Sequence, residues 1–244
     1  MNSLKMYQVS TLQALALGYT KSVITVEELL RHGDFGLGTF EGVNGEMIVL
    51  DGRCYQAAAD GTVFEASAKE GVPFCAVSQM AEETHFQIGK TADIDALKSF
   101  LDVIIDERFE LNSMHLVRID ACFSKVMARS ETGKASHHVE LKSLLENNQQ
   151  DFCFNNIEGS LVCVYFPDFM DGINAAGWHL HFVSQDRTKG GHVFDVSFEK
   201  ANAAINTINS IEIKLPDDAY FDTYALKEAS NSDIKKVEQG NSRR

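Results

Sequence analysis

The spacing of apolar residues predicts three helices in the first half of the chain. The strongest pattern lies at residues 93–107, where apolar side chains recur every three or four positions. These apolar residues are Ile94, Leu97, Leu101, Ile104 and Ile105. Two shorter helices are expected near the N-terminus, the first with Ser10 or Thr11 as its N-cap and the second with Thr25 and Glu28 as a capping box.

Short apolar runs predict that most of the other elements are strands. The runs at 47–50 and 53–56 flank Asp51-Gly52, and Asp60-Gly61 leads into the run at 63–64. Asp-Gly between apolar runs is a strong hairpin signal, because both central positions of that turn require positive φ. The further strands expected are 115–119, 123–128, 152–154, 160–166, 178–184, 192–198 and 211–215.

Together these elements predict an α/β protein of mixed α+β class, with two β-sheet-based domains and peripheral helices. The polar stretch at 146–150 is the best candidate boundary. It gives an N-terminal domain of residues 1–150 and a C-terminal domain of residues 151–244. The polar stretch at 130–138 is expected to be a loop. Residues 225–244 contain few apolar side chains and are expected to form a C-terminal tail.

The composition fits a soluble globular protein, with 44% hydrophobic and 23% charged residues. No apolar run approaches the roughly 20 residues needed to span a bilayer. Residues 1–7 lack the pattern of a signal peptide, so we expect a cytoplasmic protein. The five cysteines form no CxxC pair, which argues against a disulfide framework and against a thiolate zinc site.

The net charge of −13 argues against nucleic acid and anionic membranes as partners, because both attract clustered lysine and arginine. The expected partner is therefore a small molecule. If that molecule is an anion, the charge of the whole protein repels it. A local arginine or a metal ion must then supply the attraction.

Two histidines alternate with large apolar residues in the expected strand at 178–184. Side chains alternate faces along a strand, so His179 and His181 share one face, with their backbones about 7 Å apart. The glycine-ended turn at 186–191 leads into His192. If these segments form a hairpin, His192 lies beside the first two as a third ligand.

Three imidazoles with an open position suit a catalytic zinc ion, although another divalent metal also binds imidazole. Other HxH families fit less well. Val183 breaks the HxHxD pattern of metallo-β-lactamase-type hydrolases, and Gln185 does not supply the carboxylate that cupins place shortly after their HxH motif. Structural roles are expected for the remaining histidines, which are His32, His85, His115, His137 and His138.

Five segments resemble parts of the acetolactate decarboxylase family. The residues 177–182 (GWHLHF) and 186–193 (DRTKGGHV) together resemble its zinc motif. Residues 32–40 (HGDFGLGTF) resemble its GD-x-GLGT segment, and residues 44–48 (NGEMI) resemble its DGEM segment, with Asn44 in place of Asp. Residues 125–129 (KVMAR) resemble the strand that ends in its active-site arginine. The resemblance extends over nearly the whole chain.

The resemblance implies a two-domain enzyme, usually a homodimer, that converts 2-acetolactate to acetoin and carbon dioxide. It implies that Zn2+ is held by three ligands, chelates the substrate and stabilises the enediolate that loss of carbon dioxide leaves. The implied ligands are His179, His181 and His192. The implied catalytic residues are Glu46, Arg129 and Glu238, and Thr39 is the implied substrate-binding residue.

Without the resemblance, the last four residues would be interpreted as surface or structural groups. The histidine pattern itself leaves two other functions open. One is a zinc hydrolase or lyase that acts on another small oxygenated substrate, and the other is a non-catalytic metal-binding domain. Formation of acetoin from acetolactate separates the first function from both alternatives.

Overall fold

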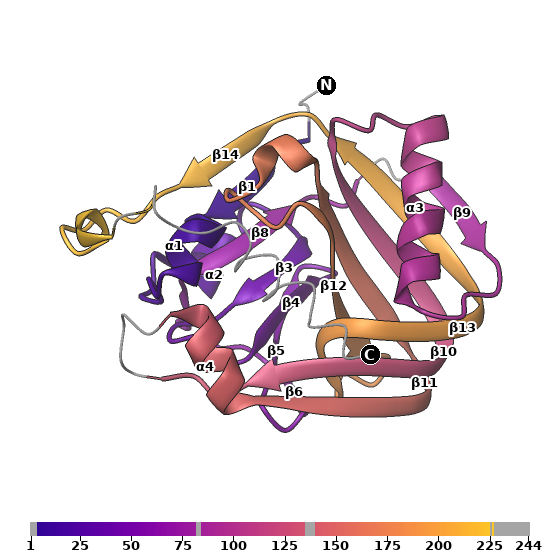
Figure 1. Cartoon of the computed structure of the whole chain (residues 1–244), viewed down its shortest axis with the longest axis horizontal. Coiled ribbons are helices and arrows are strands. Elements are labelled where there is room, and N and C mark those ends of the chain that lie inside the picture. The colour runs from indigo at the N-terminus through magenta and orange to yellow at the C-terminus, as the bar shows by residue number, and fades with distance from the viewer. Residues whose placement is uncertain (1–3, 82–83, 135–139, 225, 227–244) are drawn as a thin grey trace.

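The computed structural model describes residues 4–81, 84–134, 140–224 and 226. It is a mixed α+β fold of two large sheets with short helices at the periphery, which confirms the predicted fold class (Figure 1). The helices are α1 (Leu12–Ala16), α2 (Val26–Leu29), α3 (Ile94–Arg108) and α4 (Leu141–Asn148), with 3₁₀ turns at η1 (Asp168–Met170) and η2 (Phe221–Thr223).

The first sheet contains seven strands. In spatial order they are β14 (Ile211–Lys214), β1 (Met6–Val9), β8 (Phe74–Ser78), β3 (Phe35–Thr39), β4 (Glu46–Leu50), β5 (Arg53–Ala57) and β6 (Val63–Glu65). Only the pair of β1 and β14 is parallel. The predicted hairpin at Asp51-Gly52 joins β4 to β5, with positive φ at both residues. Two short strands, β2 (Ile24–Thr25) and β7 (Gly71–Val72), pair beside this sheet.

The second sheet is built from long antiparallel strands. Its order is β10 (Met114–Glu131), β11 (Gln149–Phe166), β12 (Gly177–Ser184), β13 (Gly190–Ile208) and β9 (Thr84–Ile88). Because β10 also pairs with β13, the four long strands form a closed ring of pairings. Helix α3 packs its apolar side against the core of this sheet (Figure 1).

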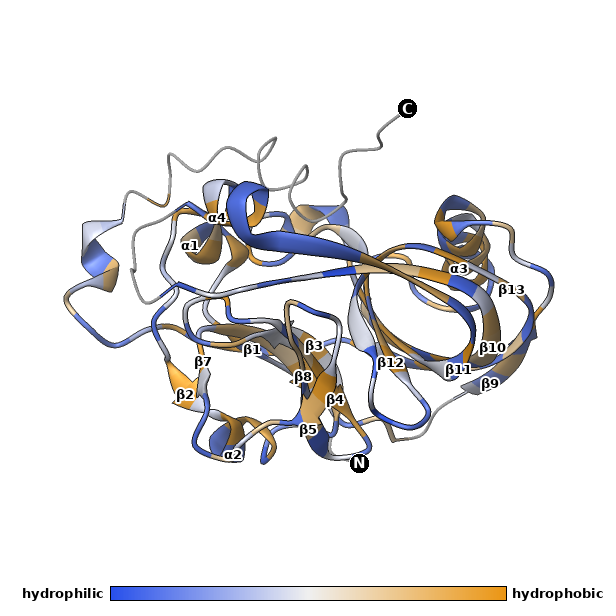
Figure 2. Cartoon of the chain, turned by 90° about the horizontal axis from the view of Figure 1, so that it is seen from below, coloured by the Kyte–Doolittle hydropathy of each residue, from blue (hydrophilic) through white to orange (hydrophobic). Residues whose placement is uncertain are grey.

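The two sheets pack face to face through alternate residues of their strands. Phe35 and Leu37 of β3 and Ile48 of β4 lie in one buried cluster with Val162 and Val164 of β11. Figure 2 shows β3, β4 and β8 mainly in hydrophobic colours. The same alternation continues to the ends of β3 and β4, where polar side chains replace apolar ones, and this is where the candidate site lies.

Several elements differ from the prediction. The runs at 115–119 and 123–128 belong to the single strand β10, whose register shifts near Ala121 and Phe123 where a break was expected. Likewise 152–154 and 160–166 belong to β11. Residues 130–131 extend β10 instead of starting a loop, and 135–139 lie outside the described residues.

The expected division at residue 150 does not coincide with the division between the sheets. Gln150 lies within β11 and pairs with Ser130 of β10, so the two sides of that position belong to one hairpin. The chain changes sheets between β8 and β9 and returns to the first sheet at β14. The polar sequence between residues 131 and 149 is typical of a linker between two domains. In the structure, however, these two residues pair with each other in the hairpin of β10 and β11.

Among the described residues, no helix is both long and apolar enough to cross a membrane.

Candidate metal and active site

Three histidine side chains meet between the two sheets. His179 and His181 lie on the face of β12 that is turned toward the first sheet, and His192 pairs with His181 across β12 and β13. His179 Nε2 lies 2.9 Å from His192 Nδ1 and 3.1 Å from His181 Nε2. The three ligand atoms all lie within 4.8 Å of one another, which is close enough to share one ion.

The predicted alternation along β12 explains this meeting. Trp178, Leu180 and Phe182 pack on the opposite face, in the core that also contains α3. Trp178 Nε1 donates a hydrogen bond of 2.7 Å to Asp102 Oδ1 of that helix. These contacts fix the direction of the histidine face, because one step along a strand turns every side chain to the other side.

The turn between β12 and β13 sets the position of His192. Thr188 N and Oγ1 both donate to Asp186 Oδ1, at 3.1 and 2.8 Å. Ser184 N donates to Lys189 O at 2.8 Å and closes the hairpin. The glycine-rich turn expected from the sequence is therefore present, and it brings the third histidine opposite the second.

The hydrogen bonds of His181 direct a lone pair toward the other imidazoles. Its Nδ1 lies 2.8 Å from Met47 O, so Nδ1 donates its proton to that carbonyl and Nε2 becomes an acceptor. This Nε2 faces His179 Nε2 and lies 3.3 Å from Glu46 Oε2. Acceptor nitrogens that converge beside a carboxylate suit a divalent cation, because each lone pair repels the others without one.

Burial keeps two of these imidazoles, those of His179 and His181, neutral. Desolvation, followed by the nearby positive charge of Arg129, lowers the pKa of His179 to about 3. Desolvation also holds the pKa of His181 well below its usual value. Neutral imidazole is the form that binds a metal, so His179 and His181 are in their binding form at neutral pH.

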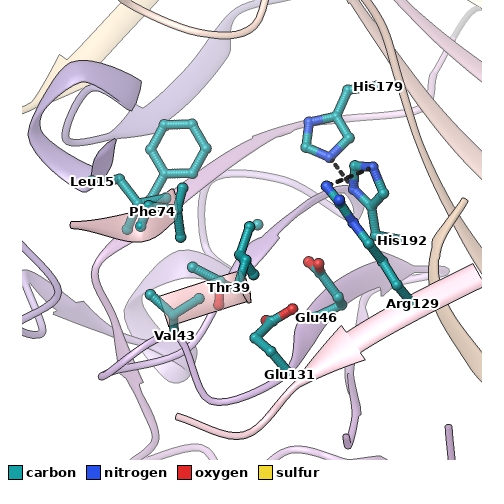
Figure 3. A pocket seen from close by; sticks show the side chains of 12 residues that line it. Leu15, Thr39, Val43, Glu46, Phe74, Arg129, Glu131, His179 and His192 are labelled. Atoms are coloured by element: carbon teal, nitrogen blue, oxygen red, sulfur yellow. Dashed lines mark hydrogen bonds between the residues drawn. The ribbon is translucent and has the colours of Figure 1, made fainter. Parts of the chain in front are cut away.

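A pocket opens beside the histidines, with one polar and one apolar side (Figure 3). It encloses about 390 Å³ of space, including its open mouth. The polar side is formed by Thr39, Glu46, Arg129, Glu131, His179 and His192. The apolar side is formed by Leu15, Val43, Phe74, Leu141 and Leu145.

Thr39 and Glu46 are held by the turn between β3 and β4. The two residues face each other in the β3–β4 pair. Thr39 Oγ1 donates to Gly45 O at 2.9 Å, inside the same turn. The backbone of Glu46 is therefore fixed, and its carboxylate lies next to the imidazoles. The side chain of Glu46 is 12% exposed.

Arg129 brings a positive charge to the pocket from β10. It is 7% exposed and lies opposite His192 in the β10–β13 pair. Its Nη2 lies 3.4 Å from His192 Nε2, and its Nη1 donates to Gln149 Oε1 at 3.3 Å. The position of Arg129 depends on a register shift between Met127 and Ala128, where β13 contains one extra residue, Phe194.

The structure brings together six of the seven residues expected at the site. Glu238 lies outside the described residues. Glu131, Gln149 and the apolar side of the pocket were not predicted from the sequence. Strand alternation from Arg129 would have indicated Glu131, because residues two apart on a strand share a face. No comparable signal marked α4, since only three of its eight residues are apolar.

These features define a class: a two-sheet α+β protein with a buried three-histidine site, a carboxylate and an arginine around a small pocket. The model of one family, described as alpha-acetolactate decarboxylase, matches residues 6–228. The alpha-acetolactate decarboxylase of Methanosarcina mazei is 36% identical over 96% of this chain and 80% of its own length. That of Lactococcus lactis subsp. lactis is 33% identical over 87% of this chain and 88% of its own length.

Solved structures agree with these relatives. The crystal structure of alpha-acetolactate decarboxylase from Bacillus subtilis strain 168 superposes with a TM-score of 0.91, at 28% identity, over 97% of this chain and all of that chain. The chain therefore belongs to the alpha-acetolactate decarboxylase family, as the resemblance predicted. It is an enzyme of the carboxy-lyase class.

Proposed function

We propose that this enzyme decarboxylates 2-acetolactate to acetoin at the pocket beside His179, His181 and His192, with Zn2+ as its cofactor. One observation carries the proposal: three buried imidazoles converge next to the guanidinium of Arg129. The names of the relatives supply the substrate, and the site supplies groups that fit its chemistry.

The donor set fits zinc. Three imidazole nitrogens with no cysteine among them are typical of catalytic zinc sites, which keep one position open for substrate. His179, His181 and His192 would hold the ion. When bound, the ion supplies positive charge that draws electron density from the ketone and hydroxyl oxygens of the substrate.

The protein's own groups bind and orient the substrate. Arg129 attracts the substrate carboxylate, against the repulsion expected from a net charge of −13. Thr39 and Glu46 lie on the same side and orient the substrate hydroxyl. The apolar side, with Leu15 and Leu145, receives the methyl groups and limits water in the pocket.

The direct test is formation of acetoin and carbon dioxide from 2-acetolactate by the purified protein, with its metal measured by elemental analysis. We expect about one zinc ion per chain. A His179→Ala/His192→Ala double variant is expected to lose both zinc and turnover. His85→Ala is the matched control, because His85 is exposed on β9.

Stoichiometric zinc in the double variant would contradict this site. Zinc with no acetoin from the wild-type protein would favour a hydrolase or lyase for another small oxygenated substrate. Zinc without turnover of any such substrate would favour a metal-binding domain.

We further propose that the enzyme is a homodimer, which the family resemblance supports, and that it acts in the cytoplasm. Light scattering after gel filtration tests the dimer, since it should give twice the mass of one chain. A monomer that retains full turnover would contradict it.

A further inference from the structure

Two buried side-chain amides, Gln8 and Asn174, hydrogen-bond to each other outside the pocket. Gln8 lies on β1 and is fully buried, and Asn174 lies between η1 and β12 and is 2% exposed. Asn174 Nδ2 donates to Gln8 Oε1 at 2.9 Å. Neither residue is among the described residues that line the pocket, so the pair does not touch the substrate in the proposed reaction.

Backbone groups fix the orientation of both amides. Gln8 Nε2 donates to Ile173 O at 2.7 Å and to Ser10 O at 3.0 Å, and carbonyl oxygens only accept. Gln8 Oε1 must therefore face Asn174. Asn174 Oδ1 accepts from Ala175 N at 2.8 Å, which directs its Nδ2 toward Gln8. The pair thus ties the residues after η1 to the end of β1 in one arrangement.

The residues after η1 also bind the N-terminus of α1. Leu12 N donates to Ile173 O at 2.9 Å, so this carbonyl accepts from both Gln8 and the helix. Gln13 N donates to Gly172 O at 3.1 Å. The first N–H groups of a helix have no partner within the helix, and here the residues after η1 supply the acceptors. Because α1 has only five residues, its position depends on such outside contacts.

Helix α1 supplies part of the apolar side of the pocket. Leu15 lines the pocket, and Figure 3 shows it next to Phe74, across the space from Arg129. Leu12, Leu15 and Phe74 lie in one buried cluster, and Ala175 packs against this cluster. The residues after η1 therefore support the apolar side in two ways, through the N-terminus of α1 and through direct packing.

We propose that Gln8 and Asn174 are positioning residues that set the room available to the alkyl groups of the substrate. This inference rests on the function proposed above, in which the apolar side receives the methyl groups of 2-acetolactate. The amide pair fixes the residues after η1, these fix α1, and α1 fixes Leu15. Without the pair, α1 can move outward and a larger alkyl group fits. The histidines stay in place, because β12 pairs with β11 from Gly177 onward.

The test compares 2-acetolactate with its homologue that has ethyl in place of methyl on the carbon that carries the hydroxyl. The wild-type enzyme is expected to prefer 2-acetolactate, because a closely packed apolar site discriminates against one added methylene. Asn174→Leu keeps the size of the side chain but removes its hydrogen bonds. We expect its ratio of kcat/KM for the two substrates to fall on the order of 10-fold. KM for 2-acetolactate should rise, whereas kcat and zinc content should change little.

Asn206→Leu is the matched control. Asn206 is a buried amide on β13 that donates to Gln79 O and Ala81 O, and it lies outside the described lining of the pocket. Guanidinium unfolding should show lower stability for both Leu variants, because each leaves buried polar groups without a partner. The substrate ratio should change only in Asn174→Leu. An equal change of the ratio in Asn206→Leu would assign it to general loss of stability and overturn the inference.

Gln8→Met is the second variant, and it decides if Asn174→Leu does not fold. Methionine keeps the length of the side chain and removes both hydrogen-bonding groups, so the substrate ratio should fall as in Asn174→Leu. An unchanged ratio in either folded variant, or no preference in the wild-type enzyme, would overturn the role of the pair and leave the decarboxylase function intact. Absence of acetoin with the wild-type enzyme would overturn the decarboxylase function itself. The two failures are therefore distinguishable.

Discussion

Arg129 is a cation buried near the histidines in a protein with a net charge of −13. Its guanidinium contacts Gln149 Oε1 and His192 Nε2, so its plane is fixed by neighbours on β11 and β13. A planar fork held in this way can bind two oxygens of one carboxylate. A lysine at this position keeps the charge but loses the fork.

Arg129→Lys should lower kcat/KM on the order of 100-fold while zinc content and fold are retained. Steady-state kinetics with 2-acetolactate and elemental analysis measure both. Arg53→Lys is the control, because Arg53 is an exposed residue paired with Glu65. Near-wild-type turnover in Arg129→Lys would show that Arg129 contributes only its positive charge and not the geometry of its guanidinium.

The sequence allowed the histidine site to be predicted because strand alternation and a short turn fix it locally. His179 and His181 are two residues apart, and His192 follows one hairpin turn later. Gln149 was not predicted, because its contact with Arg129 depends on how β10 and β11 pair over a long hairpin. Local patterns do not contain that information.

At the scale of single elements, the glycines of β3 are set by how closely β8 approaches. A Cβ atom added at Gly38 would lie 2.4 Å from Phe74 O and 2.7 Å from Cys75 Cα, both in the backbone of β8. Only glycine fits without a shift of one strand. Thr39, the next residue, is positioned by the same close approach.

Gly38→Ala should therefore lower the free energy of unfolding by about 1–3 kcal/mol. Turnover should also fall, because a shift of β3 moves Thr39 within the pocket. Chemical denaturation and kinetics measure the two effects. Gly89→Ala is the matched control, since nothing lies within 4 Å of a Cβ added there. If the two variants have the same free energy of unfolding, β3 and β8 can move apart slightly without loss of stability, which would contradict the prediction.

The last described segment of the chain contacts the turn that follows α1. Tyr224 Oη donates to Gly18 O at 3.2 Å, just after α1, and Leu15 of α1 lines the pocket. Glu238 follows fourteen residues after Tyr224. Its proposed catalytic role rests on the family resemblance.

Glu238→Gln and a truncation of residues 237–244 should both lower turnover with little change in thermal stability. Gln keeps the reach of the side chain but removes its charge, so equal losses show that the carboxylate is needed. If only the truncation is damaging, the segment acts without Glu238. Full activity in both variants would show that the alignment of this segment with the family is wrong.

Regular helices and Asp-Gly hairpins were predicted well, because capping residues and turn residues act locally. Thr11, Thr25 and Asp93 each accept a hydrogen bond at the N-terminus of their helix, as N-cap residues do. The strands β1, β3, β8 and β9 and helix α4 were missed. Strand β3 has glycine at alternate positions, and α4 is largely polar, so neither shows clear periodicity.

At the scale of the whole molecule, buried histidines couple stability to pH. Burial lowers the pKa of His115, His179 and His181, in the case of His179 to about 3. The unfolded chain binds protons on these groups below about pH 6.5, whereas the folded chain does not. Stability therefore falls as the pH drops from about 6.5 toward 3.

Chelator-treated protein should lose stability between about pH 6.5 and pH 5, as measured by guanidinium unfolding. Carboxylates with lowered pKa, such as Asp186, titrate below 3.8 and do not contribute in this interval. Zinc-loaded protein should show a steeper loss, because protons compete with the metal. If the guanidinium unfolding midpoint of chelator-treated protein were the same at both pH values, the histidines would not be buried in their neutral form.

The polar and the apolar lining of the pocket come from different kinds of element, and this has an evolutionary consequence. Its polar groups come from strands that are hydrogen-bonded within the sheets, whereas Leu15, Leu141 and Leu145 come from α1 and α4. Under selection for a bulkier or smaller substrate, mutations in these two helices can accumulate while the reacting groups stay in place. Substrate specificity can therefore change within the family while the catalytic groups and their geometry are retained.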